Sequence, residues 1–349
     1  MNTEAKLTPV REAHRFDEAA LAKYLKTRLD GFAEPIRILQ FEGGQSNPTY
    51  LLDCGDQKYV LRKKPPGKLL PSAHQVEREF RVMKALEHTD VPVPRMYLLC
   101  EDEKVIGTAF FVMEYVEGRL FTNVTLPGLS PGERRAIYFE MIRVLAALHS
   151  VDYEALGLSD FGKSGNYFAR QIGRWSKQYV SAKTDQIPSM EHLMNYLPQN
   201  VPPDDMTCIV HGDYRMENML FHPTEPKILA LLDWELSTLG HPFGDLAYSC
   251  GPYHFTMAGN PSLQGVCGPE SGIPTESEFV AEYCRRTGRP GIPSWDFYLA
   301  FAFFRLASIC QGVYKRGLMG TASSTQALER GRLTRAISDL AWSFIERDS

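Results

Sequence analysis

Two carboxylates and one amide stand beside short apolar runs near the middle of the chain. Asp213 and Asn218 lie within residues 211–218, and Asp233 comes fifteen residues after Asn218, directly behind two leucines. Oxygen ligands of this kind suit Mg²⁺, which takes few protein ligands and completes its shell with waters and nucleotide phosphates. Asp and Asn in loops also form Asx turns with nearby backbone. The spacing of the whole set, with each member next to an apolar strand, favours a functional site.

The elements that would position these residues begin with a sheet-rich region. Short β-prone runs alternate with the turn formers Gly43–Gly44 and Gly55–Asp56. A first helix is expected at residues 17–29, and a second helix at 74–86 has a buried apolar stripe. The expected strands are 36–41, 49–53, 58–62, 96–100 and 109–115. We therefore predict a five-stranded sheet with one inserted helix over residues 30–115.

Helical signals dominate after Gly118. Ser130 and Glu133 form a capping box with Pro131 at the first helical position, which predicts a long helix to about residue 149. A second capping box begins at Thr275, and Gly288 would end that helix. Between them a short β-rich island is expected at residues 207–210, 219–221 and 228–232. The sequence thus predicts an α+β fold of two lobes, a small antiparallel β N-lobe (1–115) and a larger, mainly helical C-lobe (116–349).

Composition excludes several classes of protein. With 44% hydrophobic and 23% charged residues, the 349-residue chain has the profile of a soluble globular protein. Its 38 Lys and Arg against 42 Asp and Glu give a net charge of −4, so we expect no nucleic-acid partner. Seven Cys without a Cys-x-x-Cys spacing indicate neither a zinc site nor a disulfide framework.

We also expect no membrane association and a cytoplasmic location. The N-terminus carries no apolar run of the kind found in secretory signals. The most apolar stretch, residues 295–309, is interrupted by Asp296 and Arg305. That stretch is too short for a membrane span and predicts a buried core helix.

The motif His-Gly-Asp-x-x-x-x-Asn followed by an Asp after an apolar strand resembles the aminoglycoside phosphotransferase family, the choline-kinase-like branch of the protein-kinase-like fold. Other segments match this family in order: residues 41–47 its phosphate-covering loop, 76–79 its helix with an ion-pairing Glu, and 113–118 its interlobe hinge. The similarity extends from about residue 30 to 345. It implies a kinase that uses ATP and Mg²⁺ to phosphorylate the hydroxyl of a small molecule.

The resemblance also implies roles for individual residues. Asp213 would orient the acceptor hydroxyl and take its proton, and Asn218 and Asp233 would hold Mg²⁺. The nucleotide would meet the loop residues, the ion-pairing glutamate and the hinge backbone, namely Gly43, Gly44, Gln45, Ser46, Glu79, Glu114 and Val116. His211 would brace the catalytic loop, and Glu235 is a weaker candidate for a contact with the metal. Asp245 is expected to tie the C-lobe together by capping, because it opens a helical segment.

One departure concerns the cation that grips the phosphates. Protein kinases place a Lys on the third strand, whereas Arg62 occupies that position here, with Lys63 and Lys64 beyond it. Strand alternation sends residues 62 and 64 to the same face, so either could reach the nucleotide. We favour Arg62 because its planar guanidinium can bind phosphate through two donors and keeps its charge.

Several functional alternatives remain open. A protein kinase is disfavoured because no Ala-Pro-Glu segment follows Asp233. A nucleotide-binding pseudokinase is an alternative, since Arg62 departs from the usual lysine. An aminoglycoside or another small alcohol could be the acceptor, although residues 240–349 contain ten acidic and ten basic residues, without the acid excess that a polycation would favour.

A narrower likeness points to one acceptor. Residues 41–50 and 61–74 resemble the kinase domain that accompanies acyl-CoA dehydrogenases. That group is associated with phosphorylating 4-hydroxyacyl-CoA thioesters. The likeness therefore implies a 4-hydroxyacyl-CoA acceptor, and an acyl-CoA dehydrogenase as a partner.

Overall fold

The computed structural model describes residues 6–42, 47–65, 74–256, 261–320 and 327–348. The chain divides into two compact units. The first comprises residues 1–122, 153–159 and 216–237, and the second comprises the remainder. Residues 216–237, which carry Asn218 and Asp233, thus make their contacts with the β-rich unit, although they follow the catalytic-loop motif of the second unit. The predicted lobe boundary after residue 115 stays a prediction.

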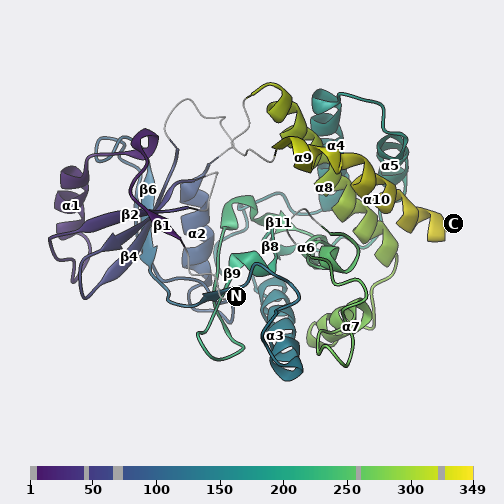
Figure 1. The fold of residues 1–349 in the computed structure, drawn as a ribbon, viewed down its shortest axis with the longest axis horizontal. Coiled ribbons are helices and arrows are strands. Elements are labelled where there is room, and N and C mark those ends of the chain that lie inside the picture. Colours follow the sequence, from purple (N-terminus) through teal and green to yellow (C-terminus); the bar gives the residue numbers. More distant parts are fainter. Residues whose placement is uncertain (1–5, 43–46, 66–73, 257–260, 321–326, 349) are drawn as a thin grey trace. The chain divides into compact units, whose positions relative to one another are not determined.

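The first unit is built on an antiparallel sheet with the strand order β1-β2-β3-β4-β6-β5 (Figure 1). Five of its strands match the predicted ones, and β1 adds a sixth that the sequence analysis did not predict. The strands are β1 (Leu7–Thr8), β2 (Arg37–Phe41), β3 (Thr49–Asp53), β4 (Lys58–Lys63), β5 (Met96–Cys100) and β6 (Phe110–Glu114).

Two helices pack against this sheet. Helix α1 (Glu18–Lys26) buries Leu21 and Leu25 in a core with Tyr50 and Phe110. Helix α2 (Val76–Leu86) contacts β5 and β6. It begins two residues later than predicted because His74 has a left-handed backbone with φ 61°. The buried face of α2 contains Glu79 among Val76, Met83 and Leu86, so a carboxylate lies within an apolar stripe.

A second, small sheet completes the first unit. Strands β10 (Ile228–Leu231), β9 (Met219–Phe221) and β7 (Arg119–Leu120) pair antiparallel. The predicted β-rich island is therefore real but split, because its first strand, β8 (Cys208–Val210), pairs instead with β11 (Thr238–Gly240) in the second unit. This split places the two halves of the island in different units.

The second unit is mainly helical. Both predicted capping boxes are present, at Ser130 before α3 and Thr275 before α7, and Gly288 has the left-handed φ of 68° expected after a helix. Its helices are α3 (Pro131–His149), α4 (Tyr167–Ala182), α5 (Pro188–Gln199), α6 (Pro242–Ser249), α7 (Glu276–Arg286), α8 (Trp295–Leu318), α9 (Ala327–Arg332) and α10 (Thr334–Asp348).

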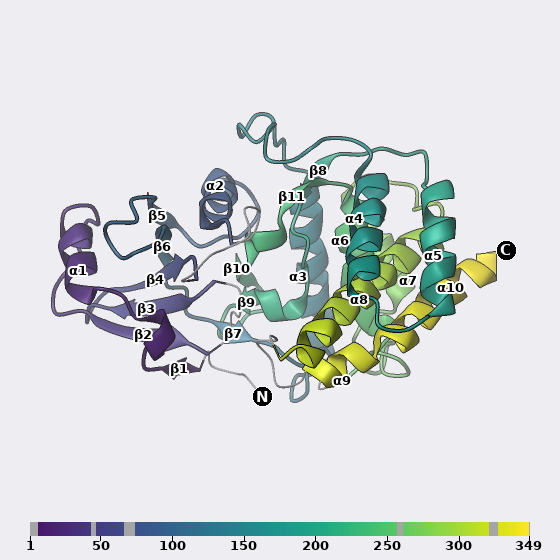
Figure 2. The same ribbon diagram turned by 90° about the horizontal axis from the view of Figure 1, so that it is seen from above.

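Helix α8 is the predicted core helix, but it is longer than expected. Its 24 residues are long and apolar enough to cross a membrane by length and composition, so the prediction that it is too short was wrong. However, 72% of its most apolar window is buried, and Figure 2 shows α8 beside α4 and α10. This burial against neighbouring helices agrees with the prediction that residues 295–309 belong to a buried core helix.

Gly118 offers a test of the small sheet. A Cβ at this position would lie 2.5 Å from the Phe221 carbonyl oxygen and 2.8 Å from Leu220 Cγ. We expect Gly118→Ala to lower the free energy of unfolding by about 1–3 kcal/mol, because the strand backbone must shift. In the control Gly132→Ala, the new methyl meets open space within α3, so stability should stay level or rise. Equal melting temperatures for the two variants would contradict this packing.

Candidate active site

Arg62 connects three segments that are distant in the sequence. Its side chain on β4 is nearly buried, and its Nε lies 2.9 Å from Glu79 Oε2 on α2. Its Nη2 donates to Asp233 Oδ1 at 2.7 Å. Lys64 instead pairs with Glu77 at 3.0 Å. The structure therefore brings Arg62, rather than Lys64, together with the predicted ion-pairing Glu79 and the predicted metal ligand Asp233.

Negative charge exceeds positive charge around Arg62. Glu235 Oε2 lies 3.9 Å from Arg62 Nη2, so three carboxylates surround one guanidinium. Burial lowers the pKa of Arg62, but Glu79, Asp233 and Glu235 outweigh it, so the net shift is upward. Burial raises the pKa of Glu79 to about 7 despite the opposing effect of Arg62, and Asp233 and Glu235 contribute to the rise. A bound cation would relieve this excess of negative charge.

Asn47 holds the other side of Glu79. The fully buried Asn47 amide donates to Glu79 Oε1 at 2.7 Å, and its oxygen lies 3.1 Å from His74 Nδ1. Asn47 is the last residue of the predicted phosphate loop, residues 41–47, of which residues 43–46 lie outside the described residues. The Arg62–Glu79 pair is thus tied to the chain at the end of that loop.

Asp233 sits in a tight turn after β10. Its backbone is left-handed, with φ 66° and ψ 59°, a conformation that Asp adopts more readily than most residues. The buried Trp234 indole donates to the Leu231 carbonyl at 2.8 Å and so fixes the turn. The Leu232 amide donates to the Asn218 carbonyl at 2.8 Å, which brings the segments carrying Asn218 and Asp233 side by side.

Asn218 and Asp233 suit a magnesium site that a nucleotide completes, rather than a metal site made wholly of protein ligands. In the described part of the chain, no group of three or more His, Cys, Asp or Glu side chains could hold a metal. One carboxylate and one amide are a donor set that suits Mg²⁺ when nucleotide phosphates supply further oxygens. The residues present therefore fit the predicted ion.

The predicted hinge residues lie at the end of β6. Glu114 pairs with Tyr59 of β4, and its backbone N–H donates to the Arg95 carbonyl at 2.8 Å. Val116 lies between β6 and β7, outside the strand ladders. The Glu114 N–H is therefore occupied, and a bound base would have to use its carbonyl or the backbone of Val116.

In the second unit, Asp245 and His211 fix the catalytic loop. Asp245 accepts hydrogen bonds from the backbone N–H groups of His211 at 2.6 Å and Gly212 at 2.9 Å. Asp245 thus ties the second unit together as expected, but the expected capping was wrong, because His241 is the N-cap of α6. Burial raises the pKa of Asp245, but hydrogen bonding and charge from His149 outweigh this effect, so the net shift is downward. His211 accepts from the Asp213 amide at 3.2 Å, in line with a bracing role.

Both carboxylate oxygens of Asp213 have partners. The Tyr248 hydroxyl donates to Oδ1 at 2.5 Å, and Arg215 Nε lies 3.3 Å from Oδ2. Arg305, which is nearly buried, donates to the Gly212 carbonyl at 2.6 Å. Asp213 belongs to the second unit, whereas Arg62, Asn218 and Asp233 belong to the first.

Sequence reasoning missed three residues of these clusters, namely Asn47, Tyr248 and Arg305. Asn47 lies within the predicted phosphate loop, and its position beside the Gly-rich turn was the one available signal. Tyr248 follows Asp245 by three residues, a spacing that puts both on one face of a helix. Arg305 interrupts an apolar helix, and a buried charge in such a place is a sign of a specific partner.

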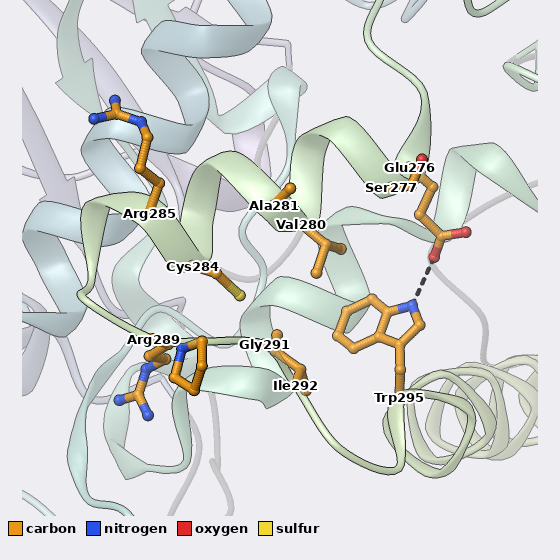
Figure 3. A pocket seen from close by; sticks show the side chains of 11 residues that line it. Glu276, Ser277, Val280, Ala281, Cys284, Arg285, Arg289, Gly291, Ile292 and Trp295 are labelled. Atoms are coloured by element: carbon orange, nitrogen blue, oxygen red, sulfur yellow. Dashed lines mark hydrogen bonds between the residues drawn. The ribbon is translucent and has the colours of Figure 1, made fainter.

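A separate pocket of about 550 Å³ lies between α7 and the start of α8 in the second unit. Figure 3 shows the Trp295 indole directed at Glu276, to which it donates at 3.0 Å. None of the predicted site residues lines this pocket.

Comparison with known proteins places most of the chain in one family. Residues 37–298 match the family model described as the phosphotransferase enzyme family. The chain is 49% identical over 344 residues to acyl-CoA dehydrogenase family member 10 of Mus musculus, and 44% identical over 342 residues to acyl-CoA dehydrogenase family member 11 of Homo sapiens. These matches cover 97% and 96% of this chain but 32% and 44% of the relatives. The chain thus spans less than half the length of these curated relatives.

Solved structures agree with this assignment. A crystal structure from Ralstonia eutropha, provisionally named an aminoglycoside phosphotransferase, is 51% identical with a TM-score of 0.88, covering 95% of this chain and 99% of that chain. A thermostable mutant of aminoglycoside phosphotransferase APH(4)-Ia, bound to AMP-PNP and hygromycin B, is 14% identical with a TM-score of 0.62 and coverage of 93% and 98%. The second likeness concerns the fold alone. The predicted family and the bilobal protein-kinase-like α+β fold are confirmed.

The Asn47 bridge predicts a stability effect. Asn47→Ala should cost about 1–3 kcal/mol in the free energy of unfolding, because the buried Glu79 carboxylate loses a donor. Asn195→Ala, on an exposed position of α5, is the matched control and should change stability little. Chemical denaturation of both variants measures the difference. A loss no larger than that of Asn195→Ala would show that the bridge does not hold Glu79.

Proposed function

Because this chain belongs to the phosphotransferase enzyme family, we propose that it is an ATP-dependent kinase that moves the γ-phosphate to the hydroxyl of a small molecule. The observation that carries this proposal is the Arg62 cluster, in which one buried guanidinium meets Glu79 and Asp233. A buried cation beside an excess of carboxylates suits a site that receives both phosphates and a divalent cation.

The proposed roles follow from the physics of phosphoryl transfer. The transition state is loose and highly charged, so positioning and electrostatic stabilisation provide most of the catalysis. Arg62 would bind the phosphates, with residues 43–46 covering them, and Glu79 would hold Arg62 in place. Asn218 and Asp233 would hold Mg²⁺, which supplies positive charge to the phosphate oxygens.

Two further roles concern the adenine base of the nucleotide and the acceptor hydroxyl. The backbone of Glu114 and Val116 would bond the adenine edge. Asp213 would orient the acceptor hydroxyl and receive its proton. The loop that carries Asp213 is fixed by Asp245 and Arg305, which gives the carboxylate the rigid support that such a role requires.

For the acceptor we propose the hydroxyl of a 4-hydroxyacyl-CoA. The names of the curated relatives support this choice, and an acyl-CoA dehydrogenase is the proposed partner. Charges near Asp213 also support an anionic acceptor. Arg215 lies beside Asp213, and Arg305 donates to the carbonyl of the preceding Gly212. Arg174 lies beside the same side chain as Arg305, since both guanidinium groups are 5.5 Å from the ring centroid of Trp175. Cations in these positions would attract an anionic acceptor and disfavour a polycation.

An aminoglycoside is the second candidate acceptor. The observation in its favour is the provisional name of the Ralstonia eutropha structure, which is 51% identical to this chain. The two candidates carry opposite charges, so salt and charge substitutions affect them in opposite ways.

Two substitutions test the separate roles proposed for Asp213 and Asp233. Asp213→Ala should lower kcat by about three orders of magnitude or more and leave nucleotide affinity within a few-fold, because the acceptor loses its orienting base. Asp233→Asn should instead abolish Mg²⁺-dependent nucleotide binding, while Asn still tolerates the left-handed backbone at this position. Steady-state kinetics and calorimetric titration with ATP and Mg²⁺ measure both effects. Near-normal turnover of Asp213→Ala would contradict the proposed role of Asp213 as the base that orients the acceptor.

A second pair of substitutions tests the cation. Arg62→Lys should retain some activity but raise KM for ATP, since a point charge replaces the two-donor guanidinium. Lys64→Ala, two residues further along the chain, is the matched control and should leave KM for ATP nearly unchanged, because Lys64 pairs with Glu77 instead. If Lys64→Ala proves the damaging change, Arg62 is not the phosphate-binding cation.

The acceptor prediction is tested by kcat/KM for 4-hydroxyvaleryl-CoA, free 4-hydroxyvalerate and kanamycin at one concentration of ATP and Mg²⁺. We expect the thioester to be the best substrate, because binding energy from coenzyme A positions the reacting hydroxyl. Its KM should rise with salt, and Arg174→Gln should raise it further. A higher value for kanamycin, or no phosphorylation of the thioester, would refute this acceptor and leave the small-molecule kinase proposal standing.

A further inference from the structure

Tyr248 donates a short hydrogen bond to the Asp213 side chain. Its hydroxyl donates to Asp213 Oδ1 at 2.5 Å from the last turn of α6. A bond from a phenol to a carboxylate is charge-assisted and is among the stronger hydrogen bonds in proteins. Burial, and then the charge of Asp213, raise the pKa of Tyr248, so the phenol keeps its proton and remains a donor.

The helix that carries Tyr248 is itself fixed to the catalytic loop. Asp245 lies three residues earlier on α6 and binds the backbone amides of His211 and Gly212. Residues three apart lie on the same face of a helix, so one face of α6 holds both the loop backbone and the Asp213 side chain. Arg305 contacts this arrangement from α8, since it donates to the Gly212 carbonyl and lies 5.5 Å from the Tyr248 ring centroid.

The two oxygens of Asp213 therefore differ. Oδ1 is bound by a tyrosine from α6, whereas Oδ2 lies 3.3 Å from Arg215, whose side chain is 48% exposed. An exposed arginine side chain can move away from its partner at little cost, because an exposed ion pair contributes little free energy. Of these two contacts, the Tyr248 bond is therefore the one that fixes the carboxylate.

We infer that Tyr248 is a positioning residue, whose bond to Oδ1 of Asp213 fixes the carboxylate in the orientation that receives the acceptor hydroxyl. This inference rests on the proposed kinase function and extends it by naming the residue that orients the proposed base. Without the phenol, the carboxylate would rotate about its terminal bond, and the reacting oxygen would be misplaced.

The kinetic test compares Tyr248→Phe with Tyr298→Phe. Each removes one buried phenol oxygen from the second unit, but the Tyr298 hydroxyl has no hydrogen-bond partner among the described residues. Tyr248→Phe should lower kcat by about 10- to 100-fold and leave KM for ATP within about two-fold, because only acceptor positioning is lost. Tyr298→Phe should match wild type. Unchanged kcat for Tyr248→Phe, or an equal loss for both variants, would overturn the inference.

A second measurement does not depend on turnover. A double-mutant cycle combines Tyr248→Phe with Asp213→Ala and follows chemical unfolding. We expect the effects to be non-additive, and we expect additive effects when Tyr298→Phe is combined with Asp213→Ala. Additivity in the Tyr248 cycle would show that the bond does not fix the carboxylate. If wild type phosphorylates no acceptor, the proposed function fails, and this cycle still decides whether Tyr248 holds Asp213.

Discussion

A buried arginine shared by three carboxylates is the constraint on which the first unit depends. Arg62 meets Glu79 at 2.9 Å and Asp233 at 2.7 Å, with Glu235 at 3.9 Å. Burying charges in this way gives little net stability, because desolvation offsets much of the attraction. Such a cluster is better explained by function, since phosphates would add anions to Arg62 and a divalent cation would neutralise the carboxylates.

Several local features of the fold follow from this constraint. Glu79 occupies a buried position on the apolar face of α2, where a carboxylate without partners would be costly. Asn47 supplies one of those partners, and Thr49 lies 3.3 Å from Arg62. Asp233 reaches Arg62 from a left-handed backbone that Trp234 helps to hold. In the second unit, Asp213 is also fixed by buried partners. Asp245 and Arg305 bind the backbone of its loop, and Tyr248 binds its side chain.

The sequence predicted the local structure well, because short-range signals encode it. It also named Arg62, Glu79 and Asp233, which the structure brings together. The two capping boxes, the Gly288 stop and five strands of the large sheet agree with the structure. Predictions failed where distant segments decide the outcome. The role of Asp245 depends on a loop more than thirty residues away, and the β-rich island is split by pairing with β7 and β11. The Asn47 and Tyr248 contacts join side chains across 32 and 35 residues, which no local pattern encodes.

In the proposed function, the Arg62 cluster receives a nucleotide together with a divalent cation. The most direct measurement is the anomalous scattering of Mn²⁺ in crystals grown with a non-hydrolysable ATP analogue. We expect a manganese peak within coordination distance of Asp233 and Asn218, with an analogue phosphate oxygen bonded to Arg62. A well-ordered analogue whose metal and phosphates contact neither Asp233 nor Arg62 would contradict the account.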